Sequence, residues 1–303
     1  MKVLLLPDRL NWAYHSIALA LVKFNNDADL VFDIEPVKKN IGRIKSIYKT
    51  YDVFLVMGHQ TYESVTFLPK SQTLVGIHSH HQFDDRKTTP DIDINPPKQL
   101  LDDLSTFSRF NVVSRRLFDL FKRNGSNNVW LTENGVDAEV FKPTSIRSER
   151  HLIVGYSGSK KHDWRKGVSE YILPAAKKAG VESKIAMLST DNYIPLADMP
   201  SFYHDIDVYL CASLSEGFSL SVLEAASCGK PVISTRVGGC VDLIEDGYNG
   251  FLVDRDIDSM AEKIACLKDG QVYADMSRAA RFKIEQEYDW SKKVADWYAF
   301  IKG

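Results

Sequence analysis

The sequence has few cysteines and no long hydrophobic run. All four cysteines lie in the second half of the chain: Cys211, Cys228, Cys240 and Cys266. No two of them stand at a CxxC or similar spacing, which predicts buried free thiols in a reducing compartment and not a disulfide framework or a zinc site. Pro7 and Asp8 interrupt the first apolar run, although a secretory signal needs roughly 7–15 apolar residues and a membrane span about 20. We therefore expect a cytoplasmic protein, peripheral at most to the inner face of a membrane.

The chain also lacks an excess of either charge. It has 38 basic and 40 acidic residues among 303, which gives a formal net charge of −2. Nucleic-acid binding depends largely on the neutralisation of phosphates by Lys and Arg, so this balance argues against a nucleic-acid partner. Hydrophobic residues make up 44% of the sequence and charged residues 26%, which is typical of a globular chain with two domains or one large α/β unit.

Short apolar runs alternate with amphipathic segments of helical length. The expected strands form two series: 3–6, 53–57, 74–77, 112–114 and 129–132, then 152–156, 184–188, 208–211, 232–234 and 251–253. The expected helices include 16–24, 100–108, 115–122 and 259–267. Most of the apolar runs are continuous, which is typical of strands buried on both faces of a parallel sheet. The alternation predicts an α/β fold with doubly wound parallel sheets.

A segment rich in turn residues separates the two series of strands. This segment, 134–150, has little periodicity and is expected to be the hinge between an N-terminal domain, 1–143, and a C-terminal domain, 144–288. The final stretch, 289–303, places its large apolar residues near one helical face. It is expected to be a helix that packs on its own domain or joins the N-terminal domain.

Two glutamates eight positions apart mark the most informative pattern in the sequence. A strand is expected to end before a loop that contains Glu216 and Gly217, and a helix to begin near Ser219. The first amides of a helix have no intrahelical partner and carry partial positive charge, so this helix start suits a diphosphate. Gly217 would let the backbone approach a ligand closely. Glu224 has apolar neighbours, and a buried carboxylate there would need polar partners such as ribose hydroxyls.

The stretch EGFSLSVLEAASCGKPVISTRVGG resembles the signature of family 4 of the retaining glycosyltransferases, also called glycosyl transferases group 1. Glu216 and Glu224 match the E-x7-E pattern of that family, and Gly238 and Gly239 match its glycine pair. Further similar pieces occur in the expected order at 133–143, 166–167, 199–213 and 246–253. The resemblance implies the GT-B fold, in which two Rossmann-like domains face each other across a cleft. It places the acceptor on the N-terminal domain and the nucleotide-sugar donor on the C-terminal one.

The resemblance also implies roles for individual residues. Glu216 would contact hydroxyls of the donor sugar, Glu224 would contact the ribose, and Lys166 would neutralise the diphosphate. The other residues expected to bind the donor are Gly158, Gly217, Phe218, Ser219 and Leu220. A second cation is expected, and the family usually has Arg at the position of Lys160. Lys160, Lys161 and Arg165 are therefore all candidates for that second cation.

His78 follows an expected strand and begins the sequence HSHH. The resemblance implies that His78 faces the donor sugar and acts with Glu216 and Lys166. The alternatives are an ordinary loop histidine or, together with His80 and His81, a metal site. No Cys or Glu stands at a spacing that supports a metal, so none is expected.

The loop after the first strand departs from the family pattern. The family often has a glycine-rich loop there, whereas residues 7–16 contain no glycine. Asp8, Asn11 and Trp12 are interpreted either as groups on the acceptor side or as residues that pack the loop.

Two acidic triplets and one basic segment complete the set of candidates. The triplets Asp91 to Asp93 and Asp205 to Asp207 read DxD, but neither has the strand–loop setting of a metal–diphosphate site. We expect both to be local charge and capping groups. From Lys38 to Lys49 the chain has five basic and no acidic residues, with isoleucines three apart. A helix there would either pack its apolar side on the core or touch an anionic membrane surface.

These observations together predict a retaining, metal-independent, hexosyl-type glycosyltransferase. It would move a sugar from a nucleoside diphosphate donor to a hydroxyl acceptor on a glycan, a lipid or another polysaccharide precursor. A UDP-sugar is favoured over a GDP- or ADP-sugar as the donor, and no other cofactor is expected. Two alternatives use the same fold: a nucleotide-sugar epimerase or hydrolase, which needs no separate acceptor, and a non-catalytic nucleotide-sugar binding protein.

Overall fold

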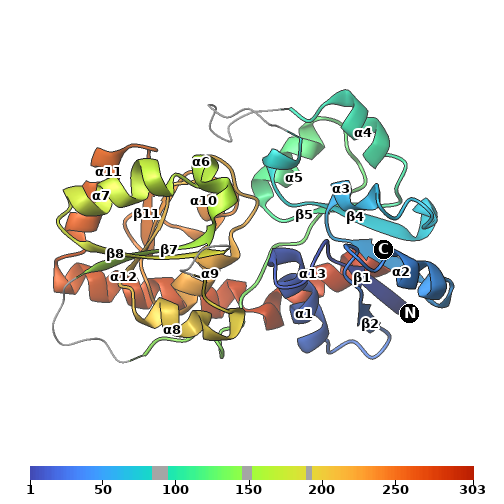
Figure 1. The fold of residues 1–303 in the computed structure, drawn as a ribbon, viewed down its shortest axis with the longest axis horizontal. Helices are drawn as coiled ribbons and strands as arrows, with labels where there is room; N and C mark the ends of the chain where they lie inside the picture. The colour runs from blue at the N-terminus through green and yellow to red at the C-terminus, as the bar shows by residue number, and fades with distance from the viewer. Residues whose placement is uncertain (84–94, 145–151, 189–192) are drawn as a thin grey trace. The chain divides into compact units, whose positions relative to one another are not determined.

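The computed structural model describes residues 1–83, 95–144, 152–188 and 193–303, which form two compact units (Figure 1). The first unit comprises the described residues of Met1–Asp85, Asp93–Asn134 and Trp290–Gly303, and the second comprises those of Gly135–Asp289. The predicted domain boundary at residue 143 lies inside the second unit. One reason is that the Val136 amide donates a hydrogen bond of 2.9 Å to the Tyr288 carbonyl.

The first unit is built on one parallel sheet. Its strands are β1 (Lys2–Leu6), β2 (Val31–Ile34), β3 (Val53–Val56), β4 (Thr73–Ile77), β5 (Phe110–Val112) and β6 (Val129–Leu131). They lie in the order β2-β1-β3-β4-β5-β6, and every pair is parallel. Four strands at the centre of the sheet are largely buried, as their continuous apolar runs predict. The strand β2 is not among the predicted strands, because its VFDI run lies at the sheet edge and is partly exposed.

Helices cover the first sheet on both faces. They are α1 (Ala13–Lys23), α2 (Ile41–Ile47), α3 (His59–Tyr62), α4 (Lys98–Leu104), α5 (Arg115–Arg123) and α13 (Trp290–Lys302), with short 3₁₀ turns η1 (Tyr48–Thr50), η2 (Lys70–Gln72) and η3 (His80–Gln82). Figure 1 shows α1 and α13 on one side of the sheet and α3, α4 and α5 on the other. The C-terminal helix α13 belongs to this unit: its Trp297 indole donates to the Glu133 carbonyl at 3.0 Å and its Lys293 pairs with the Glu133 carboxylate at 2.7 Å.

The second unit contains a second parallel sheet. Its strands are β7 (Ile153–Ser159), β8 (Glu182–Leu188), β9 (Val208–Cys211), β10 (Val232–Thr235) and β11 (Gly250–Val253). Their order is β11-β10-β9-β7-β8, all parallel. The order of strands reverses between β7 and β9. In open α/β sheets, ligands bind at such a switch point, outside the carboxyl ends of the strands. The loops after β7 and β9 are therefore the place to look for a site.

Helices lie on both faces of the second sheet as well (Figure 1). The α-helices are α6 (Asp163–Lys166), α7 (Leu173–Lys178), α8 (Met199–His204), α9 (Leu220–Ser227), α10 (Cys240–Leu243), α11 (Ile257–Cys266) and α12 (Gly270–Lys283). The shorter turns and π-helices are η4 (Lys160–His162), η5 (Val168–Ile172), η6 (Leu196–Asp198) and η7 (Ile284–Tyr288). The two all-parallel sheets confirm the predicted doubly wound α/β class. None of the helices in the described ranges combines the length and the apolar character that a membrane span requires.

The cysteines are all free thiols, as expected. Cys211, Cys228 and Cys240 are buried, but Cys266 is exposed, so the prediction of burial is wrong for this residue. Cys266 is the last residue of α11, and the helix turns its Met260 and Ile264 face to the core instead.

Candidate functional site

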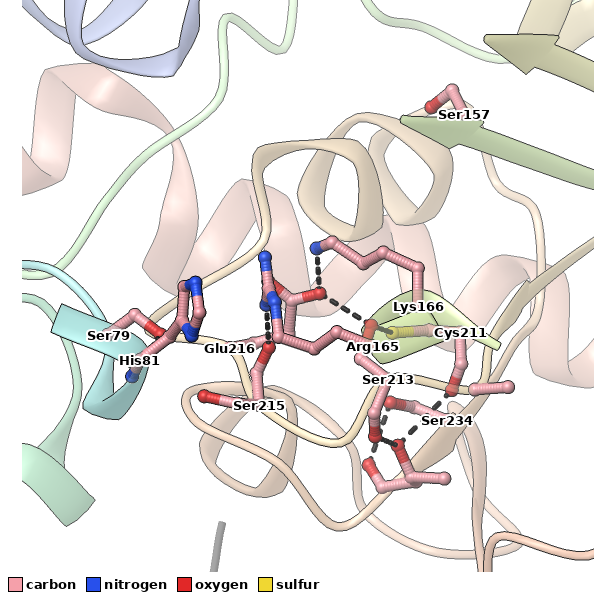
Figure 2. A network of polar contacts seen from close by, with 12 residues as sticks. Ser79, His81, Ser157, Arg165, Lys166, Cys211, Ser213, Ser215, Glu216 and Ser234 are labelled. Carbon is pink, nitrogen blue, oxygen red and sulfur yellow. Dashed lines mark hydrogen bonds and ion pairs between the residues drawn. The ribbon is translucent and has the colours of Figure 1, made fainter. Parts of the chain in front are cut away.

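A shielded ion pair lies at the carboxyl end of the second sheet (Figure 2). Lys166, the last residue of α6, contacts the Oε1 atom of Glu216 with its ammonium group. The Ser213 hydroxyl donates a hydrogen bond of 2.6 Å to the same oxygen. The Lys166 and Glu216 side chains are only 16% and 10% exposed. This ion pair therefore links the segments that follow β7 and β9 at the switch point of the sheet.

The surroundings of Glu216 keep its carboxylate charged. Burial raises the pKa of this carboxyl, but the positive charges of Lys166 and Arg165 outweigh that effect, and the pKa lies below its ordinary value. The Arg165 guanidinium donates to the Ser215 carbonyl. Its buried Nε–H has no hydrogen-bond partner within the described part of the chain. The site thus combines an anionic acceptor with a guanidinium donor that an anionic ligand could use.

A pair of glycines holds the loop that carries Glu216. The Gly239 amide donates a hydrogen bond of 2.7 Å to the Gly217 carbonyl. Gly238 has a φ of +44°, and a Cβ there would overlap the Gly217 and Glu216 carbonyl oxygens. A Cβ on Gly239 would overlap the Phe218 ring, which is buried edge-on against Tyr288 with ring centroids 5.4 Å apart. Only glycine allows this close approach, so the pair fixes the loop.

Helix α9 begins directly after this loop. Ser219 is its N-cap residue, and the Ser219 side chain makes no capping hydrogen bond. Ser219 and Leu220 are partly exposed, whereas Phe218 is buried. The predicted diphosphate contacts at these positions would therefore use backbone amides of the first helical turn.

Glu224 lies on α9 in a different environment from Glu216. It is half-buried, and the Tyr203 hydroxyl donates a hydrogen bond of 2.6 Å to its Oε2 atom. Burial raises the pKa of the Glu224 carboxyl to about 7, although the hydrogen bond from Tyr203 lowers it in part. The two glutamates of the E-x7-E pattern thus have opposite shifts. One is held as an anion, and the other changes its charge near neutral pH.

The three candidates for a second cation lie in different surroundings, and which of them would meet a diphosphate stays a prediction. Arg165 is the one whose charge acts on Glu216. Lys160 and Lys161 are exposed on η4. Gly158, near the end of β7, has no room for a side chain, because a Cβ there would overlap the Tyr156 hydroxyl.

Two residues that sequence reasoning missed support the site. Tyr203 precedes β9, and nothing in the sequence distinguishes it from an ordinary core aromatic. Arg255, beyond the end of β11, donates from Nε to the Ala212 carbonyl at 2.7 Å, and its guanidinium lies 4.2 Å from the Tyr171 ring centroid. It also reaches the Arg165 carbonyl at 3.5 Å. Arg255 therefore ties the end of β9 to the segment that carries Lys166.

A comparison of the sequence with known families identifies the segment in which these residues lie. Residues 139–269 match the family described as "Glycosyl transferases group 1". Residues 139–269 of this chain are therefore similar to group 1 glycosyltransferases. The matched segment includes both glutamates, Lys166, Tyr203 and Arg255.

A curated relative is similar to part of the chain. The chain is 33% identical to N-acetyl-alpha-D-glucosaminyl L-malate synthase of Bacillus anthracis over 133 residues, which cover 43% of this chain and 33% of that protein. The match thus spans about a third of the length of this curated relative.

Solved structures resemble the chain over nearly its whole length. Sucrose-phosphate synthase from Thermosynechococcus elongatus has a TM-score of 0.76 at 14% identity and covers 100% of this chain and 98% of its own. Anabaena HepE, solved in complex with UDP and glucose, has a TM-score of 0.70 at 17% identity and covers 99% of both chains. These likenesses establish the GT-B fold, as the sequence predicted.

The predicted residues outside the matched segment lie in the first unit. His78 follows β4, and burial lowers its pKa to about 3, so its imidazole is neutral at pH 7. In the described ranges no hydrogen-bond partner is found for its buried Nε2 atom. The ring lies edge-on to Tyr14, with centroids 4.8 Å apart. His80 is buried, and no set of three His, Cys, Asp or Glu side chains in the described parts of the chain is placed to bind a metal.

The loop after β1 is held by its own residues. Arg9 pairs with Asp8 at 2.9 Å, and its guanidinium lies 3.9 Å from the Trp12 ring centroid. Asn11 adopts a left-handed backbone with a φ of +58°. These contacts agree with the interpretation that the loop is packed, and whether it also meets an acceptor stays a prediction.

The remaining acidic and basic candidates have local partners. Asp205 pairs with Lys184 at 2.5 Å, and Asp207 accepts a hydrogen bond of 2.8 Å from the Ile153 amide at the amino end of β7. Both contacts fit local charge and capping groups. The triplet Asp91 to Asp93 lies outside the described residues. In the basic segment, α2 buries Ile44 but leaves Ile41 37% exposed.

A cavity of about 840 Å³ lies elsewhere in the second unit. Its lining includes Cys228 and Lys230, which follow the C-terminal end of α9, and Phe282 of α12. None of the predicted site residues lines this cavity. It is therefore distinct from the site around Glu216 and Glu224.

Proposed function

We propose that this chain is a retaining glycosyltransferase that transfers a sugar from a nucleoside diphosphate donor to a hydroxyl acceptor. UDP-sugars are the favoured donors, and a glycan, a lipid or another polysaccharide precursor is the favoured acceptor. Lys166 and Arg165 supply the positive charge for the diphosphate, so the chemistry is proposed to need no metal.

One observation supports this proposal above the others. The Lys166–Glu216 pair is shielded from water, lies at the switch point of a parallel sheet, and precedes a helix start that can bind an anion. An ion pair with no role in binding would more often lie on the solvated surface, where desolvation costs little. The similarity of residues 139–269 to group 1 glycosyltransferases and the likeness to a UDP-bound neighbour support the same function.

The proposed reaction uses the charges of these residues. The bond between the sugar C1 and the phosphate oxygen breaks, and a new bond forms from C1 to the acceptor oxygen on the same face of the sugar. The acceptor proton moves to the leaving diphosphate. Lys166 and Arg165 stabilise the negative charge that develops on that leaving group, while Glu216 accepts hydrogen bonds from the sugar hydroxyls. Glu224 binds the ribose hydroxyls.

A donor panel tests the function directly. The purified chain is incubated with UDP-, GDP- and ADP-glucose and their N-acetylglucosamine counterparts, with and without simple glycoside acceptors, and products are followed by mass spectrometry. Nuclear magnetic resonance of the new linkage gives the anomeric configuration. We expect an acceptor-dependent product that keeps the α configuration of the donor.

Matched variants connect any activity to the site. We expect Glu216→Gln to lower kcat on the order of a hundredfold or more, as for the loss of one key transition-state contact. The control is Glu182→Gln, which removes an exposed carboxylate from β8. Full activity in a folded Glu216→Gln protein would contradict the assigned role.

The same panel separates the two alternatives. An epimerase or hydrolase converts the donor without any acceptor. A non-catalytic binding protein is stabilised by nucleoside diphosphates in a thermal-shift assay but shows no turnover, since any ligand that binds only the folded state raises its stability.

We also infer a peripheral contact between the segment from Lys38 to Lys49 and anionic lipid. Lys38, Lys39 and Lys49 are exposed, and Ile41 stands 37% exposed beside them on α2. Flotation with phosphatidylcholine vesicles that contain or lack phosphatidylglycerol tests this contact. Equal binding to both kinds of vesicle, or none, would contradict it.

A further inference from the structure

The Tyr203 side chain links strand β7 to α9, the helix that carries Glu224. It projects from α8, is fully buried, and packs against the rings of Phe141 and Tyr209 with centroids 5.8 and 6.1 Å away. Its hydroxyl lies 3.1 Å from the Ser157 hydroxyl of β7 and donates to Glu224 on α9 at 2.6 Å. The phenol therefore cannot move without disturbing both neighbours.

The hydrogen bond from Tyr203 leaves one half of the Glu224 carboxyl available. Tyr203 occupies Oε2, and within the described residues no hydrogen bond reaches Oε1. A glutamate side chain has three rotatable bonds, so an unanchored carboxyl would sample several orientations. Anchoring at one oxygen gives the other oxygen a fixed direction. A site can distinguish a ligand hydroxyl from a hydrogen only if its hydrogen-bond acceptor is held in a fixed direction.

We propose that Tyr203 is a positioning residue that orients Glu224 and thereby sets the preference for nucleotides with ribose hydroxyls. This inference rests on the proposed function, because it assumes that a nucleoside diphosphate binds beside Glu224. Tyr203 itself is buried and is not expected to touch the ligand. Its effect should therefore be on selectivity more than on the overall strength of binding.

The protein offers a matched control for this test. Tyr209 is a second buried tyrosine of the same cluster, and its hydroxyl bonds the Ser157 carbonyl at 3.1 Å. The structure shows no bond from Tyr209 to Glu224 among the residues described. Tyr203→Phe and Tyr209→Phe each remove one buried hydroxyl from the same aromatic cluster. Only the first removes the bond to Glu224.

The experiment compares the affinities of UDP and its 2′,3′-dideoxy analogue for the full chain and its variants by calorimetric titration. GDP, ADP and their dideoxy analogues are titrated in the same way. We expect the wild type and Tyr209→Phe to prefer the ribonucleotide by roughly tenfold or more, as for one or two hydrogen bonds to a buried carboxyl. We expect Tyr203→Phe to lose most of that preference while its affinity for the dideoxy analogue stays within about twofold. Added to Glu224→Ala, the Tyr203 change should have no further effect on the preference.

The outcomes separate the inference from the proposed function. If none of the nucleotides binds the folded wild type, both are overturned. If the wild type prefers ribonucleotides and Tyr203→Phe keeps that preference, the proposed function stands and the positioning role is wrong. The positioning role also fails if Tyr203→Phe weakens both ligands equally, because that result indicates a structural effect alone.

Discussion

The ammonium group of Lys166 and the carboxylate of Glu216 form an ion pair between the segments that follow β7 and β9. The two residues are 50 positions apart in the sequence. The pair is shielded from water, and Ser213 donates to the same carboxylate oxygen. A charge pair in such surroundings is costly to desolvate, so it is weak support for a purely stabilising role. Its place at the switch point favours a role in binding.

Removing one charge of the Lys166–Glu216 ion pair should destabilise the fold. We expect Lys166→Met to lower the free energy of unfolding by roughly 3 kcal/mol, because it leaves a buried carboxylate without its partner. The double variant Lys166→Met/Glu216→Gln should recover most of that loss without recovering activity. Urea denaturation at pH 7 measures both variants. A double variant as unstable as the single one would show that the charges are not coupled.

The two glutamates should give opposite dependences of stability on pH. The folded-state pKa of Glu224 is raised from 4.5 to about 7, so between these values the folded state binds more protons than the unfolded state and stability falls as pH rises. Removing this group should therefore stabilise the protein at pH 8 but not at pH 4.5. Between pH 4.5 and pH 8, we expect the free energy of unfolding of Glu224→Gln to rise by roughly 2 kcal/mol relative to that of the wild type, after allowance for partial exposure.

Glu216 provides the control for this experiment. Its folded-state pKa lies below its ordinary value, so its contribution to stability is present above that value and lost as pH falls through the folded-state pKa. Relative to the wild type, Glu216→Gln should therefore lose stability at neutral pH and less in acid. Urea denaturation at a series of pH values follows both variants. Parallel curves for the two variants would be inconsistent with the assigned environments.

The glycine pair can be tested separately from the charges. Gly238→Ala places a Cβ where the Gly217 and Glu216 carbonyl oxygens lie, so it should displace the loop and lower kcat at least roughly tenfold. Gly247→Ala is the control: its φ of +82° is equally unfavourable for alanine, but no atom lies within 4 Å of the new Cβ. Its cost should be about 1 kcal/mol of stability with normal kcat. Similar kinetics for the two variants would argue against a role for the close approach.

Arg255 should act through the residues that it holds. Arg255→Lys keeps the charge but cannot bond both the Ala212 carbonyl and the Arg165 carbonyl with one planar group. We expect a lower kcat with a smaller change in the free energy of unfolding than for Lys166→Met. Steady-state kinetics and denaturation on the same preparations check this. Unchanged kcat in Arg255→Lys would mean that the carbonyl contacts do not position the site.

Much of the fold could be predicted because its signals are local. Continuous apolar runs such as Val208–Cys211 identify buried strands without knowledge of their neighbours. The start of α9 after Ser219 was predicted closely, and Gly229 follows its end with a φ of +69°. The strand β2 was missed because its run at the sheet edge lacks the continuous apolar character of the inner strands.

The site was less predictable because its contacts are long-range. The E-x7-E pattern identifies both glutamates. It does not indicate that the pKa of Glu216 is lowered while the pKa of Glu224 is raised to about 7. That difference comes from the charges of Lys166 and Arg165, which lower the pKa of Glu216, and from burial, which raises the pKa of Glu224. The second cation was left among three neighbours for the same reason. Lys160 and Lys161 lie on η4 and Arg165 lies on α6, so the direction of each side chain depends on how these two short helices are folded.

The most direct test of the account is the affinity of nucleoside diphosphates for a protein that lacks the Lys166 charge. UDP, GDP and ADP are titrated by calorimetry into the wild type, Lys166→Met and Lys184→Met, the last of which loses a partly exposed lysine that pairs with Asp205. We predict that the nucleotide bound by the wild type binds Lys166→Met at least roughly tenfold more weakly and Lys184→Met with unchanged affinity. Equal affinities for the wild type and a folded Lys166→Met protein would contradict the account.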